Sequence, residues 1–204
     1  MKTSRLIAAA LTVAASFALN AQSLMTPWAA DVTPENVWSQ YPRPIMERPD
    51  WLNLNGQWDY AILPKGAATP TGYDGKILVP FAVESALSGV GKTVGENNEL
   101  WYRRSFKTPS SWKGKDVKLN FGAVDWRADV WVTGVKVGSH EGGYCPFSFN
   151  ITGALKPKGE NEIVVRVFDP TDAGFQPRGK QVANPHGIWY TPVTGIWQTV
   201  WLEP

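Results

Sequence analysis

Short apolar segments recur along most of this chain, and glycine or proline closes each one before a helical period can develop. Val117–Phe121 alternates apolar and polar residues, the pattern of a strand with one buried face. Ile163–Val167 is apolar on both faces apart from Arg166, as in a central strand. Many short strands with little helix predict an all-β fold, an antiparallel jelly-roll β-sandwich. The other expected strands are Trp58–Ile62, Leu100–Phe106, Ala128–Val132, Val135–Val137 and Ile196–Leu202.

The sequence also predicts a hairpin turn and an extended N-terminal segment. Thr133-Gly134 predicts a hairpin turn, and because β-branching disfavours φ > 0 we expect a bulged or type II-like turn there rather than type I′. Residues 22–48 are rich in proline and have no sustained period, so we expect an extended lead that packs along the domain. Helix is expected only in short stretches such as Pro34–Gln40.

The N-terminus has the layout of a secretory signal. Lys2 and Arg5 precede an apolar run, Leu6–Leu19, which is too short for a mature membrane anchor. We expect a signal peptide over residues 1–21, cleaved after Ala21, and an exported protein in the periplasm or outside the cell. The remaining 183 of the 204 residues can bury a sizeable core.

Composition excludes several classes of function. The chain has 20 basic and 18 acidic residues and a net charge of +2, so nucleic acid and anionic membrane are not expected partners. Cys145 is the only cysteine, and we expect a small packed side chain rather than a nucleophile. Two histidines, His140 and His186, have no zinc-ligand spacing, and there is no phosphate-binding or dinucleotide motif. No metal and no cofactor are therefore predicted.

Tryptophan is the most informative residue type, with 11 in the chain. Its flat face packs against pyranose rings, but aromatic side chains also dominate protein cores. We expect core positions for the five tryptophans in strand patterns, which are Trp58, Trp101, Trp131, Trp197 and Trp201. Trp189 and Tyr190 follow an aperiodic loop, where a binding role and a core role are equally expected.

Several motifs occur in an order that resembles one known family. Leu54–Trp58 reads Leu-Asn-Gly-Gln-Trp, the opening of the sugar-binding domains of family 2 glycoside hydrolases. The resemblance runs from about residue 48 to 204, and its motifs are specific together although each alone is weak. The others are Val79–Phe81, Leu100–Phe106, Phe121–Asp125, Ala128–Val132, Val137–Tyr144, Pro146-Phe147, Asn150–Thr152 and Thr194–Glu203.

The resemblance implies a galactose-binding-domain-like jelly roll over residues 49–204. In complete members an immunoglobulin-like sandwich and a (β/α)₈ barrel follow, and the members include β-galactosidases, β-glucuronidases and β-mannosidases. Their retaining chemistry uses two barrel glutamates about 5–5.5 Å apart. A barrel takes roughly 250 residues, so no residue here matches a catalytic position, and the chain is expected to end before the hydrolytic part. Asp125 and Asp129 are expected to be solvated strand-end residues instead of a catalytic pair.

The resemblance also implies a sugar contact. In several members an aspartate after the strand preceding the last long loop reaches the non-reducing-end sugar, and Asp169 occupies the matching place. An equal alternative is a turn-forming role before Pro170. His186, Trp189 and Tyr190 are weaker candidates on the same loop, and Arg178 and Lys180 could pair with an acidic sugar or simply be solvated.

Three hypotheses for function follow. The first is the sugar-binding domain of a retaining exo-glycoside hydrolase acting in carbohydrate degradation, with the immunoglobulin-like and barrel domains as its partners. The second is a free-standing carbohydrate-binding module without hydrolase activity. The third is a structural sandwich that docks against partner domains. The first is favoured, because a pocket completed largely by a barrel leaves few convergent polar groups here.

Overall fold

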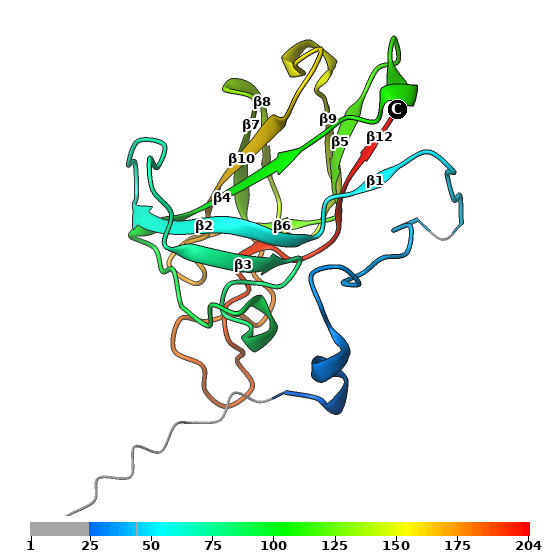
Figure 1. The fold of residues 1–204 in the computed structure, drawn as a ribbon. Coiled ribbons are helices and arrows are strands. Elements are labelled where there is room, and N and C mark those ends of the chain that lie inside the picture. Colours follow the sequence, from blue (N-terminus) through cyan, green and yellow to red (C-terminus); the bar gives the residue numbers. More distant parts are fainter. Residues whose placement is uncertain (1–24, 44) are drawn as a thin grey trace, which may run out of the picture.

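Two antiparallel sheets face each other across an apolar core (Figure 1). The computed structural model describes residues 25–43 and 45–204, so the expected signal peptide lies outside the described residues. The strands are β1 (Leu52–Asn53), β2 (Gly56–Pro64), β3 (Gly75–Val79), β4 (Asn98–Phe106), β5 (Lys118–Phe121), β6 (Val124–Asp125), β7 (Arg127–Val132), β8 (Val135–Glu141), β9 (Phe147–Asn150), β10 (Asn161–Phe168), β11 (Gly195–Ile196) and β12 (Val200–Glu203). Four short 3₁₀ helices are η1 (Pro27–Asp31), η2 (Ala86–Ser88), η3 (Ser110–Trp112) and η4 (Thr152–Ala154).

The larger sheet has six strands in the order β3-β2-β4-β10-β7-β8, and the smaller has four in the order β1-β12-β5-β9. A two-stranded sheet, β11-β6, adjoins them. Strand β10 lies between β4 and β7, the central position that its apolar sequence predicts. The all-β sandwich is thereby confirmed. In the described ranges no helix has the length and apolar character needed to cross a bilayer.

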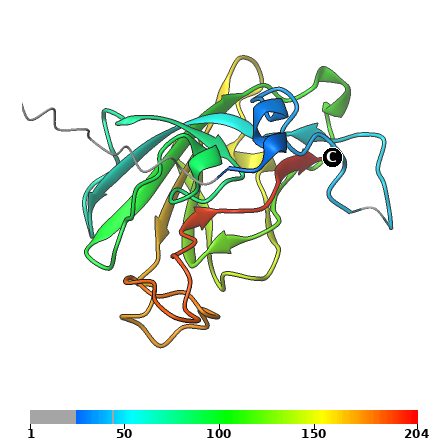
Figure 2. The same cartoon turned by 90° about the horizontal axis from the view of Figure 1, so that it is seen from below.

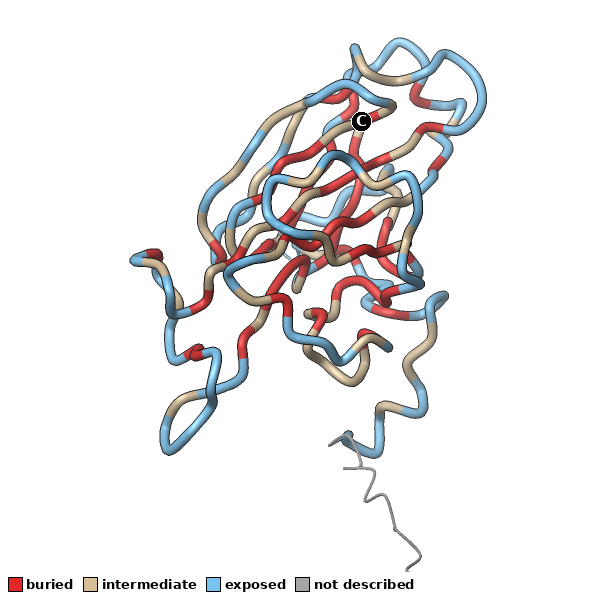
Figure 3. The backbone as a smooth tube through the Cα atoms, turned by 90° about the vertical axis from the view of Figure 1, so that its left-hand side faces the viewer, coloured by how far each residue is buried: buried red, intermediate tan, exposed pale blue. Residues whose placement is uncertain are grey.

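The core lies between the inner faces of the two sheets, where buried segments run through the middle of the molecule (Figure 3). Alternation decides which residues enter it. In β10 Ile163, Val165 and Val167 are fully buried in the core, whereas Val164 and Arg166 between them face the other side of the sheet. Period-two side-chain direction in a strand produces this division.

The predicted core tryptophans separate into two groups. Trp58, Trp101 and Trp201 are at most 2% exposed, as expected. Trp131 and Trp197 are only half-buried, so the prediction of core positions is wrong for these two. Trp131 stacks on Trp101 on the outer face of the six-stranded sheet, with ring centroids 5.9 Å apart.

Three local expectations are also corrected. Thr133 and Gly134 both adopt positive φ (49° and 81°), so the β7–β8 turn has the type I′ signs that threonine was expected to avoid. Residues 34–38 form a turn closed by a 3.0 Å bond from Val37 N–H to Thr33 O, not a helix, and Trp38 (φ 44°) ends it. Cys145 is exposed, because it lies in the loop between β8 and β9 rather than in a strand.

The expected strand Ile196–Leu202 is divided in two. β11 pairs with β6 in the small sheet, and β12 pairs with β1 and β5 in the four-stranded sheet. The chain changes sheets at residues 197–199, where Gly122 N–H still bonds to Thr199 O at 2.9 Å. A continuous apolar pattern therefore does not reveal that the segment serves two sheets.

The N-terminal segment lies against the four-stranded sheet. Val37 and Tyr41 are buried, and the Tyr41 hydroxyl donates to Glu203 Oε1 at 2.6 Å. Asn53 Nδ2 donates to the backbone carbonyl of Trp38 at 2.8 Å. These contacts join residues 37–41 to strands β1 and β12.

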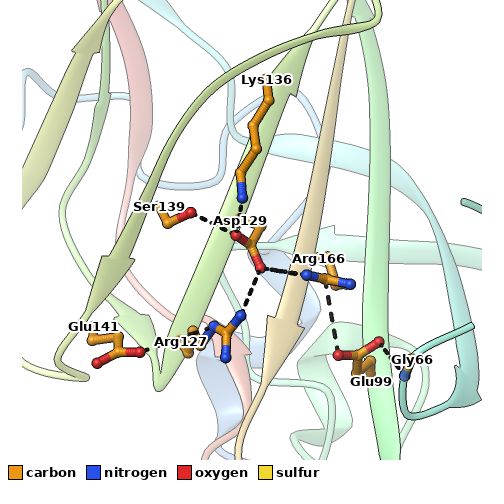
Figure 4. A network of polar contacts seen from close by, with 8 residues as sticks. All are labelled: Gly66, Glu99, Arg127, Asp129, Lys136, Ser139, Glu141 and Arg166. Carbon is orange, nitrogen blue, oxygen red and sulfur yellow. Dashed lines mark hydrogen bonds and ion pairs between the residues drawn. The ribbon is translucent and has the colours of Figure 1, made fainter. Parts of the chain in front are cut away.

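A buried carboxylate organises the outer face of the six-stranded sheet (Figure 4). Asp129 is 2% exposed in the middle of β7, so the expectation of a solvated strand-end residue is wrong. Its Oδ1 accepts from Lys136 Nζ at 2.7 Å and Ser139 Oγ at 2.6 Å, and its Oδ2 accepts from Arg166 at 2.8 Å. The Arg127 guanidinium lies 3.7 Å away. Long cationic side chains cover the carboxylate while keeping their charged ends near water.

These partners stabilise the ionised form of Asp129. Burial alone would raise its pKa, but the hydrogen bonds from Lys136, Ser139 and Arg166 outweigh burial and hold the pKa well below its usual range. A carboxyl whose pKa is lowered by folding stabilises the native state above its unfolded pKa. That contribution is lost as the pH falls through the folded pKa.

We therefore predict that Asp129→Asn lowers the free energy of unfolding at pH 7 by about 1–3 kcal/mol, because three donors lose an ionised acceptor. The difference from the parent should shrink below about pH 4, where the unfolded aspartate is protonated. Urea denaturation at several pH values measures both effects. Asp116→Asn, at an exposed position before β5, is the control. An equal difference at about pH 3 and pH 7 would contradict the prediction.

Candidate functional site

The segment between β10 and β11 forms a long loop at one end of the sandwich, away from the C-terminus (Figures 1 and 2). This loop, residues 169–194, carries every site residue that the sequence predicts. Its base is tied to the segment before η2, since Thr194 N–H donates to Glu84 Oε2 at 2.9 Å and Val83 N–H donates to Thr194 O at 3.3 Å. We call the loop and its base the loop end.

Asp169 lies at the base of the loop end, directly after β10. It is 2% exposed, and its Oδ1 accepts from Thr171 N–H at 2.8 Å while its Oδ2 accepts from the Thr194 hydroxyl at 2.9 Å. Burial raises its pKa despite these hydrogen bonds. The expected turn-forming role is confirmed, because the bond to Thr171 closes a turn two residues on. The expected sugar contact stays a prediction.

Two further acids share this base, the partly buried Glu84 and the buried Asp125, and sequence reasoning did not identify either as part of the site. Burial raises the pKa of Glu84 to about 7, against hydrogen bonds from Thr194 and with a further rise from the charge of Asp169. Its Oε1 is buried and has no hydrogen-bond partner among the described residues. No pattern around Glu84 distinguishes it from an ordinary loop glutamate, since its hydrogen-bond donor, Thr194, is distant in sequence.

Asp125 is the third acid, and it is 3% exposed rather than solvated as expected. Burial raises its pKa to about 6, opposed by a 2.9 Å hydrogen bond from Gln181 Nε2 and assisted by the charge of Asp169. Gly143 packs so closely that a Cβ there would collide with the Asp125 carboxylate. The conformation of the Gly142-Gly143 segment thus serves packing against Asp125.

Gln181 connects this base to the outer part of the loop. It is 8% exposed; its Oε1 accepts from Val193 N–H at 2.6 Å, and its Nε2 also reaches the Tyr144 hydroxyl at 3.4 Å. A buried amide with donors and acceptors satisfied on three segments fixes their relative positions. Gln181 is a positioning residue that no sequence motif distinguishes.

The other predicted residues lie on the outer part of the loop end. His186 and Tyr190 are exposed and Trp189 is half-buried. Trp189 N–H donates to His186 O at 2.9 Å, and Tyr190 N–H donates to Lys180 O at 2.8 Å. Within the described contacts these three join one another and the 178–182 segment but not Asp169.

The two loop cations lie over aromatic rings. The Arg178 guanidinium is 6.0 Å from the Trp189 ring centroid, and Lys180 Nζ is 6.0 Å from that of Tyr190. Such contacts hold a cation near a ring face without neutralising it. The loop end therefore combines a rigid acidic base with an exposed rim of aromatic and basic side chains. In the part of the chain that the structure describes, no group of three or more His, Cys, Asp or Glu residues could hold a metal ion.

Comparison with known proteins agrees with the fold. The family model described as glycosyl hydrolase 2 galactose-binding domain-like matches residues 75–192, which includes most of the loop end. The chain belongs to this family. The resemblance expected from the Leu54–Trp58 and later motifs is thereby confirmed.

Relatives within glycosyl hydrolase family 2 are considerably longer than this chain. A β-galactosidase of Thermoanaerobacter pseudethanolicus is 39% identical over 76% of this chain and 21% of its own length. A β-glucuronidase of Formosa agariphila is 38% identical over 53% of this chain and 11% of its own length. The chain thus spans about a fifth or less of these two relatives.

A solved structure gives the same architecture. The β-glucuronidase of Ruminococcus gnavus in complex with a C6-substituted uronic isofagomine is 23% identical, with a TM-score of 0.58 over 80% of this chain and 30% of that chain. At this identity the comparison supports the fold.

Because the pKa of Glu84 is raised, we expect the free energy of unfolding to depend on pH. Between about pH 4.5 and 7 the native state holds a proton that the unfolded state has released, so the free energy of unfolding falls as the pH rises through this window. Glu84→Gln should flatten this dependence and be more stable than the parent at about pH 8, by roughly 1–3 kcal/mol. Thermal or urea denaturation from pH 4 to pH 8 tests this; a variant as pH-dependent as the parent would contradict it.

Proposed function

We propose that this chain is the sugar-binding domain of a retaining, exo-acting glycosidase with β-galactosidase-like or β-glucuronidase-like activity. The observation that carries the proposal is the loop end, where a buried polar base supports an exposed rim of His186, Trp189 and Tyr190. Loops held by a rigid scaffold are where binding residues concentrate. The relatives whose names are β-galactosidase and β-glucuronidase support the substrate class.

The proposed sugar contacts divide between the base and the rim. His186 and Tyr190 are exposed and can meet a non-reducing-end sugar directly, and the half-buried Trp189 offers a ring for stacking. Asp169 contributes from the base, because an ionised carboxylate has about four acceptor positions and the protein occupies only some of them. Arg178 and Lys180 at the rim favour a sugar that carries a carboxylate.

Three buried aspartates of this chain are held by the protein in ways that do not suit retaining hydrolysis. That chemistry needs a free nucleophile and an acid–base group on opposite sides of one glycosidic bond. Asp129 is covered by three cationic side chains, and Asp125 and Asp169 accept hydrogen bonds from the protein. We therefore assign the catalytic carboxylates to a separate domain.

The outer loop also offers a surface for such a domain. Phe175 is fully exposed, and Ile188 is 65% exposed. Apolar side chains gathered at one exposed loop are typical of surfaces that another domain covers. The docking role and the sugar-binding role are therefore compatible, since a partner domain on this end would complete a pocket around the rim.

We predict that the purified 204-residue chain releases no nitrophenol from β-galactoside or β-glucuronide substrates above the blank. If the reading frame continues downstream, the longer protein that it encodes should cleave one of these substrates. In that product Asp169→Asn should lower kcat/KM about 10- to 100-fold, the effect of removing a charged hydrogen-bond acceptor.

Asp116→Asn, with unchanged kcat/KM, is the matched control for Asp169→Asn in the extended product. Circular dichroism and melting temperature separate a lost contact from lost folding. Turnover by the 204-residue chain that disappears when one of its own acids is substituted would overturn the proposal. An Asp169→Asn product with the parent's kcat/KM would remove Asp169 from the site.

We also propose that the protein is exported, on the basis of the signal sequence before Gln22. Expressed in a bacterial host, the protein should appear in the periplasm or medium with Gln22 as its first residue, since signal peptidases cut after a small residue such as Ala21. N-terminal sequencing tests the cleavage. Leu11→Arg, which interrupts the apolar run, should retain the uncleaved chain in the cell; unchanged export of this variant would contradict the proposal.

A further inference from the structure

A second hollow lies away from the predicted site residues, between the N-terminal segment and the sandwich. Its volume is about 780 Å³, within the range of small-molecule sites in proteins. Residues 38–43 form one wall, and strand β12 and the segment before it form another. We call this the aromatic groove; its lining residues are Trp38, Gln40, Tyr41, Pro42, Arg43, Pro80, Gly122, Tyr144, Pro146, Trp197, Gln198, Thr199 and Trp201.

The rings of the groove are held at their polar ends by the protein itself. Trp201 Nε1 and the Tyr41 hydroxyl both donate to Glu203 Oε1 at 2.6 Å. Trp197 Nε1 donates to Gly143 O at 2.8 Å. Because Tyr41 and Trp201 are buried, only the half-buried Trp197 of these three rings has substantial carbon surface open to the groove. The rings are also fixed before any ligand arrives, which lowers the cost of binding.

Exposed aromatic side chains occupy the edges of the groove. Trp38 is 61% exposed and Tyr144 is 49% exposed, and neither is needed to fill the core. The Tyr144 and Trp197 rings meet edge to face, 6.3 Å apart at 72°. Large exposed rings grouped around a hollow indicate a recognition surface more strongly than the same rings scattered singly.

The polar groups of the groove suit hydroxyl groups. Gln40, Gln198 and Thr199 supply amide and hydroxyl donors and acceptors beside the rings. Arg43 is the one charged residue among those lining the groove, and its guanidinium lies 5.3 Å from the Trp201 ring centroid. Ring surfaces next to neutral amides match a pyranose, which has an apolar C–H face and a rim of hydroxyls.

We propose that the aromatic groove binds a short neutral oligosaccharide. This goes beyond the proposed function, because the groove shares no lining residue with Asp169, His186, Trp189 or Tyr190. The Tyr144 hydroxyl links the groove to the loop end, since Gln181 Nε2 approaches it at 3.4 Å. The groove therefore binds sugar in the isolated chain, whereas the loop end depends on a second domain to complete its pocket.

The test is calorimetric titration of the 204-residue chain with cellotriose, β-1,4-galactotriose and a trigalacturonate. We expect binding of at least one neutral trisaccharide. Trp38→Ala and Tyr144→Ala should each weaken it about tenfold, the loss of one aromatic contact. Trp28→Ala is the matched control, since Trp28 is 71% exposed on η1 and does not line the groove. Near-ultraviolet circular dichroism checks the fold of each variant.

Three other results would contradict the groove proposal. Failure of both neutral trisaccharides to bind overturns the groove proposal but not the proposed function, which expects the isolated loop end to bind weakly. Binding that survives Trp38→Ala and Tyr144→Ala but is lost in Tyr190→Ala also overturns it, and places the sugar at the loop end. Tighter binding of the trigalacturonate than of the neutral sugars excludes a neutral ligand.

Discussion

The pairing of β10 with strands on both of its sides is the constraint on which the rest of the structure depends. Seven residue pairs align it with β4 and six with β7, so one strand fixes the centre of the larger sheet. Its inner side chains fill the core, and Arg166 on its outer face reaches Asp129. Because β10 ends at Phe168, the same pairing determines where Asp169 and the loop end begin.

The environments of Asp129 and Glu84 shift the pKa values of their carboxyl groups in opposite directions. Asp129 lies under Lys136, Arg166 and Arg127, and these cations keep it ionised. At the loop end Glu84 is partly buried, with a hydrogen bond from Thr194 but without a bridging cation among the described ion pairs, and its pKa rises. The cations around Asp129 stabilise the sheet. Glu84 has no such cation among the described ion pairs, so its desolvation makes the free energy of unfolding depend on pH.

Two surfaces of the domain are thus suited to different tasks. The loop end has a rigid base and an exposed rim that offers an incomplete set of contacts, as expected where a second domain supplies the rest of a pocket. The aromatic groove is lined by several segments of this chain, with Tyr41, Trp197 and Trp201 already held in place. Tyr144 of the groove and Gln181 of the loop end approach each other at 3.4 Å.

The sequence by itself determined the strands and the family, because both depend on local patterns: alternation in segments such as Ile163–Val167, and ordered motifs such as Leu54–Trp58. It also selected Asp169 and the loop. Only the tertiary structure decided that Trp101 packs against Trp131, that the carboxylates of Asp125 and Glu84 lie near Asp169, and that residues 38–43 line a groove beside Trp201. The physical reason is that burial and desolvation arise between residues far apart in the chain, and no local period records them.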